Sequence, residues 1–185
     1  MKILIKIRKL IRELRTSNLL TRTPHEIRSR ANRQITSTLV TVSRVGRFIY
    51  NSLNRENGHK YRQFILPLRN FKDLSRAAKE KLHKKALYHK NDDVIVHCTC
   101  PYFKYTLEVA LTGYKASQII TSNGAHPRIR NPRRKTYLCK HLVAAVARFD
   151  NDVQKHNANK EKSARAPIKD LIKQINTQDN VNDIR

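Results

Sequence analysis

The feature that most constrains this chain is a pair of short motifs, Cys-x-Cys and Cys-x-His, which are separated by residues 101–138. Together they use all three cysteines of the sequence and one histidine: Cys98, Cys100, Cys139 and His141. A structural zinc ion takes four thiolate or imidazole ligands in a tetrahedron, and this set meets that requirement. The sequence therefore predicts a zinc ion that holds together the two ends of a long excursion. Its binding would offset the entropic cost of ordering the chain, which a small hydrophobic core does not offset alone.

Other uses of the cysteines fit the sequence less well. An odd number of cysteines does not close a disulfide framework, and the pattern suits a reducing compartment. His97 is an alternative ligand, but strand alternation points it to the face opposite Cys98. Four protein ligands leave no open coordination position, and no nucleophile constellation or glycine-rich phosphate loop accompanies them. We therefore expect that the protein is not an enzyme.

Charge gives the clearest indication of a partner. The 185-residue chain carries 39 Lys and Arg against 14 Asp and Glu, a formal net charge of +25. An excess of this size predicts a polyanionic partner, which is either nucleic acid or an anionic membrane surface. Residues 1–15 contain no apolar run free of charge, so they predict neither a signal peptide nor a membrane span.

The hydrophobic pattern predicts an α+β domain over residues 37–150. Strands are expected at residues 39–43, 47–51, 61–66 and 93–98, with a turn at Gly46, a second turn at residues 54–58, and Pro67 ending the third strand. Helices are expected at residues 73–88, 102–111 and 138–149, the last of which places Cys139 and His141 in its first turn. These elements indicate a small antiparallel meander with a helix laid across it.

Residues 1–36 are predicted to form a basic helical arm. Its first helix has apolar residues at helical spacing between Lys and Arg: Ile3, Ile7, Leu10, Ile11 and Leu14. We expect this stripe to dock on the domain or a partner, with a membrane or nucleic acid as the alternative. A second helix is expected to run to about Gln34, with Thr23 as N-cap, Pro24 at the first helical position and Glu26 closing a capping box.

Residues 151–185 are predicted to be a polar linker followed by a tail helix. The linker covers residues 151–166, which are rich in charged residues, Ala and Asn. The tail helix is indicated by apolar residues at helical spacing: Ile168, Leu171, Ile172 and Ile175. Because this spacing makes an apolar stripe, we expect the tail helix to dock on another surface.

The densest basic segment lies inside the excursion, so the metal would hold it in a defined shape. The candidate nucleic-acid-binding residues are Arg128, Arg130, Arg133, Arg134, Lys135 and Lys140. We interpret them as phosphate contacts, with a solvated loop or an acidic protein surface as the alternatives. Aromatic residues near the cysteines (Tyr102, Phe103, Tyr105 and Tyr137) are expected to pack around the zinc core, with base stacking as the alternative.

The zinc motif resembles that of SWIM zinc fingers, as do the apolar strand before Cys98 and the run Leu-Cys-Lys-His-Leu at residues 138–142. More narrowly, residues 98–105, 121–124, 130–132 and 138–142 together with Pro127 resemble small SWIM-type proteins encoded by large tailed bacteriophages. The resemblance covers residues 38–148. This chain has Tyr102 where members commonly have an acidic residue, which changes the charge of the loop and not the ligands.

The resemblance implies DNA binding or protein–protein contact, and the sequence lacks the motifs of the helicases and transposases to which SWIM modules are often attached. We therefore expect a non-enzymatic, zinc-stabilised basic protein that binds nucleic acid, in particular a virion structural component near packaged DNA. One alternative is a virion structural adaptor whose arms bind acidic surfaces of other virion proteins. Another is an intracellular DNA-binding regulator. The expected location is the virion, and during assembly it is the cytoplasm of the infected bacterial host.

Overall fold

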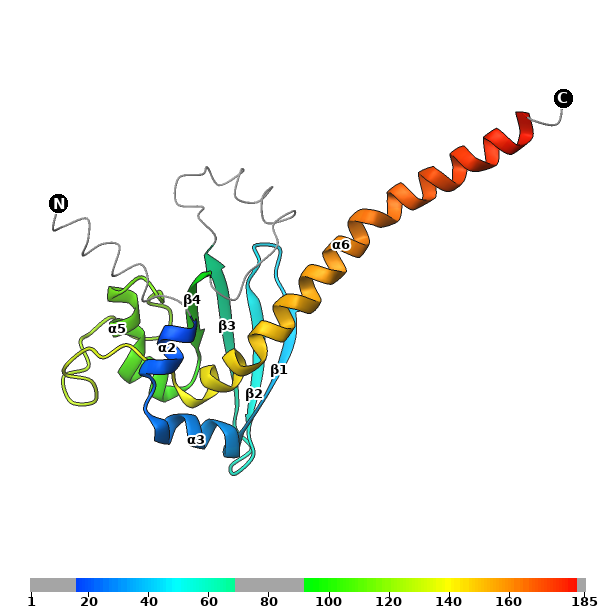
Figure 1. Ribbon diagram of the computed structural model, residues 1–185. Helices are drawn as coiled ribbons and strands as arrows, with labels where there is room; N and C mark the ends of the chain where they lie inside the picture. Colours follow the sequence, from blue (N-terminus) through cyan, green and yellow to red (C-terminus); the bar gives the residue numbers. More distant parts are fainter. Residues whose placement is uncertain (1–15, 69–91, 183–185) are drawn as a thin grey trace, which may run out of the picture.

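The computed structural model describes residues 16–68 and 92–182. These residues form an α+β fold in which helices cover a four-stranded antiparallel sheet (Figure 1). The predicted fold class is therefore confirmed. The helices predicted at residues 1–15 and 73–88 lie outside the described residues. Within the described part of the chain, no helix is both long enough and apolar enough to cross a bilayer.

The sheet is a meander whose strands lie side by side in their order along the chain. The strands are β1 (Ile35–Val42), β2 (Phe48–Asn54), β3 (Lys60–Leu68) and β4 (Asp93–Cys98). Gly46 and Gly58 lie in the two tight connections with φ of 77° and 68°, a conformation that glycine adopts without the steric cost of a Cβ. The four predicted strands and both turns are confirmed.

The prediction that Pro67 ends the third strand is wrong, because β3 continues to Leu68. Pro67 pairs with Val94 of β4, whereas the pairing of β2 with β3 stops at Phe48 and Ile65. Pro67 therefore lies beyond the end of β2, where the strand has a neighbour on one side only. A missing backbone N–H is tolerated at such an edge position.

Two helices precede the sheet, α2 (Thr16–Arg22) and α3 (His25–Gln34). The sequence did not predict α2, and α3 ends where predicted. The capping box is wrong: Pro24 is the N-cap of α3, and no side chain caps the helix. The hydroxyl of Thr23 instead donates to the carbonyl of Leu19 (2.7 Å) and accepts from the N–H of Leu138 (3.0 Å). The Thr23 hydroxyl is therefore engaged with Leu19 and with Leu138, which is distant in sequence, and it does not cap α3.

After β4 the chain forms a π-helical turn η1 (Phe103–Leu107), a short helix α5 (Glu108–Gly113) and the long helix α6 (Lys140–Asn182). The helix predicted at residues 102–111 is confirmed in outline, and the one predicted at 138–149 begins at Lys140. The linker predicted at residues 151–166 is wrong, because α6 runs through it without a break. Asp152 and Val153 are buried and His156 meets Phe48 edge to face, so packing stabilises the helix at the start of a segment whose composition looks like a linker.

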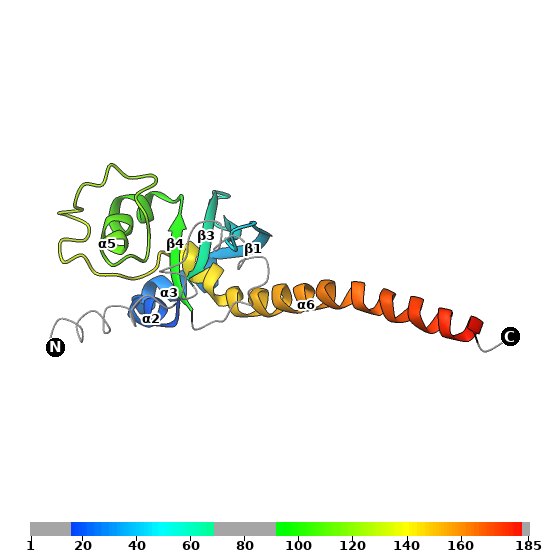
Figure 2. The ribbon, with the colours of Figure 1, turned by 90° about the horizontal axis from the view of Figure 1, so that it is seen from above.

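The core lies between the sheet and α6, which crosses one face of the sheet and projects far beyond it (Figures 1 and 2). Phe48 of β2 meets Phe149 of α6 edge to face, with ring centroids 5.2 Å apart. The same cluster of buried residues includes Cys98, Cys100 and Cys139. Each large apolar side chain buried in it contributes about 1.5–3 kcal/mol. The candidate metal ligands therefore form one end of the hydrophobic core.

Candidate metal centre

The first pair of ligands comes from the end of β4 and the bend after it. Cys98 is opposite Gln63 of β3, and its side chain faces the core. The next residue, Thr99, stays tied to β3, because its N–H donates to the carbonyl of Arg62 (3.0 Å) and its hydroxyl accepts from the N–H of Arg62 (3.0 Å). This anchored bend allows Cys100 to turn back toward Cys98, which strand alternation also favours.

The second pair lies at the start of α6. Cys139 immediately precedes the helix, and its carbonyl accepts the N–H of Val143 (2.9 Å), while His141 is in the first turn. Their predicted place at the beginning of a helix is confirmed. The positive end of the helix dipole stabilises negative charge there, including that of a thiolate. The candidate metal centre therefore lies where the end of the sheet meets the start of the helix that covers it.

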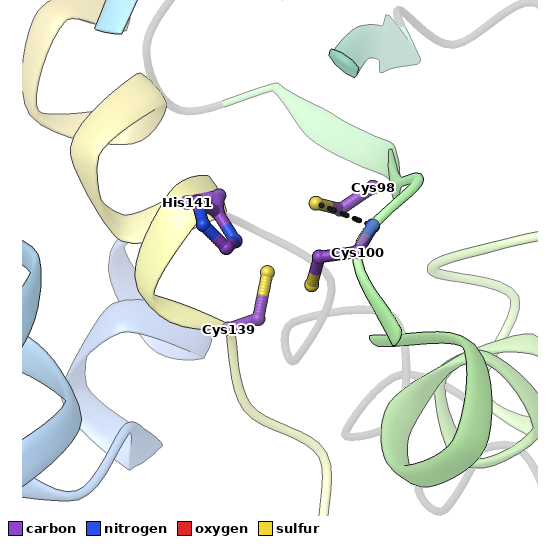
Figure 3. A group of neighbouring side chains, drawn as sticks. All are labelled: Cys98, Cys100, Cys139 and His141. Carbon is purple, nitrogen blue, oxygen red and sulfur yellow. Dashed lines mark hydrogen bonds between the residues drawn. The ribbon is translucent and has the colours of Figure 1, made fainter. Parts of the chain in front are cut away.

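The structure brings the four predicted ligands together. Their side chains converge from β4 and α6 on one point (Figure 3), and their ligand atoms all lie within 4.8 Å of one another. All four residues are buried, with exposed fractions between 0% and 4%. In tetrahedral zinc sites, with zinc–sulfur bonds of about 2.3 Å, neighbouring ligand atoms lie about 3.5–3.8 Å apart. The cluster can therefore hold a metal ion after small movements of its side chains.

Hydrogen bonds outside the cluster orient its sulfur atoms. The N–H of Phe103 donates to Sγ of Cys100 at 3.3 Å, and the amide of Gln63 donates to Sγ of Cys98 at 3.6 Å. Gln63 is fully buried and is itself held by the hydroxyl of Ser52, which donates to its Oε1 at 2.6 Å. Such outer contacts fix the position of metal ligands and tune their charge. Sequence spacing did not predict this role for Gln63.

Burial and mutual hydrogen bonds shift the pKa of all three thiols in the cluster. Burial raises the pKa of Cys98 and of Cys139 well above the usual range of a thiol. The pKa of Cys100 is lowered instead, chiefly by side-chain hydrogen bonds from Cys139 and Cys98. In the absence of a cation, burial therefore disfavours the thiolate form of Cys98 and Cys139. A divalent ion among the sulfur atoms reverses that balance and deprotonates the coordinating thiols.

The polar atoms of the cluster also fit a metal. Both ring nitrogens of His141 are buried and have no hydrogen-bond partner among the described residues, which is costly for a polar side chain in a core. A metal bond to one nitrogen would remove part of that cost. None of the three cysteines forms a disulfide. Three thiols and one imidazole are a donor set typical of structural zinc sites.

His97 lies on the other face of β4, as strand alternation predicted, and is not part of the cluster. It stacks on Phe64 with ring centroids 5.2 Å apart, and its Nδ1 lies 3.4 Å from Oε1 of Glu108. Glu108 is fully buried, and its carboxylate accepts the N–H groups of Ile120, Thr121 and Ser122 at 2.6–3.1 Å. This carboxylate anchors the middle of the excursion to α5. A single acidic residue in an apolar helical stretch was the only sequence signal for it.

The predicted phosphate-binding residues form an exposed loop of defined shape. Arg128, Arg130, Arg133, Arg134 and Lys135 are all exposed, and none forms an ion pair with another residue that the structure describes. Asn131 is buried between them. Its amide nitrogen donates to the carbonyls of Thr106 and Lys135 (both 3.0 Å), and its oxygen accepts the N–H of Lys135 (2.9 Å). Asn131 therefore holds the loop against η1 and directs the cations outward.

Lys140, the sixth predicted residue, lies apart from this loop. It begins α6, is half-buried, and its Nζ donates to Oε1 of Gln34 at 2.9 Å. Lys140 thus links the start of α6 to the end of α3. Any phosphate that it contacts must share its ammonium group with Gln34.

Comparisons with models of known protein families, with curated proteins and with solved structures found no match. The structure itself shows a buried cluster of three cysteines and one histidine, which is a candidate metal-binding motif. The resemblance to SWIM zinc fingers stays a prediction from the residues of that motif.

Proposed function

We propose that this protein is a non-enzymatic, zinc-stabilised protein that binds nucleic acid through the loop at residues 128–135. In this proposal the zinc ion is structural, because the four protein side chains fill its tetrahedron. The metal and Asn131 keep the loop in one conformation, and its cations contact the phosphate backbone. Such contacts provide affinity with little dependence on sequence.

One observation carries the proposal: five exposed cations lie on a loop that buried groups hold in place. A solvated charged loop does not need a buried asparagine with three hydrogen bonds at its centre. Arg134 also adopts a φ of 49°, a left-handed conformation that is unfavourable for arginine. Conformational cost of this kind is typical of functional loops. The net charge of +25 further supports a polyanionic partner.

The proposal is tested by removing two loop cations together, Arg133→Ala with Arg134→Ala, and by measuring DNA binding by fluorescence anisotropy between about 50 and 200 mM salt. We expect the affinity to fall by the same factor for unrelated sequences. The slope of log K against log salt is negative, and we expect it to become less steep by about 2, which corresponds to two lost phosphate contacts.

The matched control removes the same charge from the exposed side of α6, with Lys155→Ala and Lys162→Ala. Both control positions are helical, so alanine does not disturb the local structure. We expect the control to bind almost as the wild type does. Equal losses of affinity in the two double variants would mean that net charge alone, and not the loop, governs binding.

We further propose that the protein acts as a virion component near packaged DNA. Support for this placement comes only from the resemblance to small SWIM-type phage proteins. If a phage encodes the chain, as the resemblance implies, mass spectrometry of its purified particles tests this placement, and absence from the particles contradicts it. In that case the intracellular regulator takes its place, whereas presence in the particle without DNA binding supports the adaptor.

A further inference from the structure

A cavity of about 490 Å³ opens beside the metal centre. Its walls come from four separate parts of the chain: the start of α3, the turn between β2 and β3, residues 100–102 and residues 137–141. Three of the four candidate metal ligands line it, Cys100, Cys139 and His141. Cavities of about 300–1,000 Å³ are the usual size of small-molecule sites. The metal centre is therefore also the wall of a space that can receive a ligand.

Three tyrosines line this cavity, Tyr61, Tyr102 and Tyr137. The hydroxyls of Tyr102 and Tyr137 are 2.8 Å apart, and the ring of Tyr61 lies against His141 with centroids 4.6 Å apart. Phe103, in contrast, is fully buried in the core, as predicted for the aromatic residues near the zinc. Tyr102 is 40% exposed, so packing around the metal does not account for it. Exposed aromatic side chains in a cavity provide stacking surfaces for flat ligands.

The charged and amide groups of the cavity suit a nucleotide. Arg30 of α3 and Lys140 of α6 supply positive charge, and Glu26 is the one acidic residue among the lining side chains that the structure describes. Asn54 and Asn57 add amide groups that both donate and accept hydrogen bonds. Aromatic faces next to cations and amides are the combination that binds the bases and phosphates of single-stranded nucleic acid.

The basic loop ends close in sequence to the cavity, although none of residues 128–135 lines it. Tyr137 follows Lys135 by two residues, so their Cα atoms lie at most about 7 Å apart. Thr136 between them is buried and accepts a hydrogen bond from Arg22 of α2 (3.0 Å), which holds this link in place. The end of the loop at Lys135 is therefore within about 7 Å, Cα to Cα, of a tyrosine that lines the cavity.

We propose that this cavity receives an unstacked base of a single-stranded nucleic acid whose phosphates lie along the loop. The inference rests on the proposed function and adds to it the form of nucleic acid that binds. In a duplex each base is stacked and paired, and taking one out costs a few kcal/mol. A site of this kind therefore prefers a single strand to a duplex of the same length.

The test compares a labelled single strand with the matching duplex, using wild-type protein and the variants Tyr102→Ala and Tyr137→Ala. Loss of a stacked aromatic is expected to weaken single-strand binding by about 5- to 150-fold. Duplex binding through the loop should stay within about twofold of wild type, because the cations are unchanged. The control is Tyr105→Ala, which removes an exposed tyrosine of the same segment that does not line this cavity.

A second measurement uses the wild-type protein, so it does not depend on a variant that folds. An oligonucleotide that carries 5-iodouracil is crosslinked to the protein by light, and the attached residue is identified by mass spectrometry. We expect crosslinks at Tyr61, Tyr102 or Tyr137. Crosslinks confined to residues outside the cavity would overturn the inference.

The outcomes separate the inference from the proposed function. If the tyrosine variants bind a single strand as wild type does while the loop variant binds weakly, the cavity has no role and the proposed function stands. If wild-type protein binds neither a single strand nor a duplex, both fail together. Single-strand binding that is lost with Tyr137→Ala and kept with Tyr105→Ala supports the inference.

Discussion

Replacing one metal ligand should destabilise the whole domain, and the structure allows the size of the effect to be worked out. A metal that joins Cys98 to His141 closes a loop of roughly 40 residues. A crosslink across a loop of that length is worth about 4 kcal/mol in the free energy of unfolding, because it lowers the conformational entropy of the unfolded chain. Domains of this size are stable by about 5–15 kcal/mol in total. Cys139→Ser, which weakens the metal site with a minimal change in shape, therefore removes a large part of the stability.

Thermal unfolding measured by circular dichroism tests this prediction. For a chain of this length about 1 kcal/mol corresponds to 2–4 °C, so the melting temperature of Cys139→Ser should fall by about 8–16 °C. Wild-type protein stripped with a chelator should show a similar fall and should recover when zinc is returned. The control is His25→Gln, an exposed histidine outside the cluster, which should melt as wild type does.

The reasoning is refuted if metal-free protein, with its zinc content verified as zero, melts within about 2 °C of the zinc-loaded form. That result would mean that the core alone stabilises the fold and that the four ligands lie together without a metal. A fall for His25→Gln as large as that for Cys139→Ser would mean that the effect does not depend on the cluster.

Three further predictions concern buried polar groups. Glu108→Gln should lower the free energy of unfolding by about 1–3 kcal/mol at neutral pH, because its carboxylate accepts several hydrogen bonds that a neutral amide satisfies less well. Burial alone raises the pKa of Glu108, but hydrogen bonds from Ser122 and Thr121 lower it more. The difference in free energy of unfolding between wild type and Glu108→Gln should therefore have its full size above about pH 4.3, the pKa of an unfolded glutamate. It should disappear as the pH falls through the lower pKa of the folded state. Denaturant titrations from about pH 6 to pH 3 measure this difference. Asn131→Ala should weaken DNA binding several-fold with all loop cations present, because the loop loses three hydrogen bonds.

Each of these has a clear contrary result. A gap between wild type and Glu108→Gln that widens on acidification would show that the carboxylate is not held in its charged form. Wild-type affinity in Asn131→Ala would show that the cations bind without a fixed loop. For Asn131, the control is Asn123, an exposed asparagine earlier in the same excursion, since Asn123→Ala leaves the hydrogen bonds of Asn131 in place.

The cluster of candidate metal ligands could be predicted from the sequence because zinc chemistry restricts both residue type and spacing. Two short motifs were enough, and no knowledge of the intervening chain was needed. The strands of the sheet were predicted from alternation and from glycine at the turns, which are also local properties. Gly46 and Gly58 adopt the positive φ that such turns require.

The wrong predictions share a cause, which is that contacts distant in sequence override local preferences. Thr23 has the sequence setting of a helix cap, yet its hydroxyl binds Leu138 instead. Residues 151–166 have the composition of a linker, but burial of Asp152 and Val153 continues the helix. Pro67 stays within a strand only because β2 ends before it.

The parts of the site that sequence reasoning missed are buried polar side chains with distant partners. Gln63, Glu108 and Asn131 each bind groups at least four residues away, and no short motif marks such contacts. The cavity was missed for the same reason, because its walls come from four parts of the chain. Its three tyrosines come from three separate segments and meet only in the folded domain.

The most direct test of the account is the binding of zinc-loaded and metal-free protein to DNA across a salt series of about 50 to 200 mM. If the metal holds the loop in a shape that binds phosphate, the zinc-loaded form binds DNA with micromolar or tighter affinity near physiological salt. Its plot of log K against log salt is then steep, and the metal-free form binds much more weakly. Binding that disappears by the upper end of the series, or that is the same with and without zinc, would contradict the account.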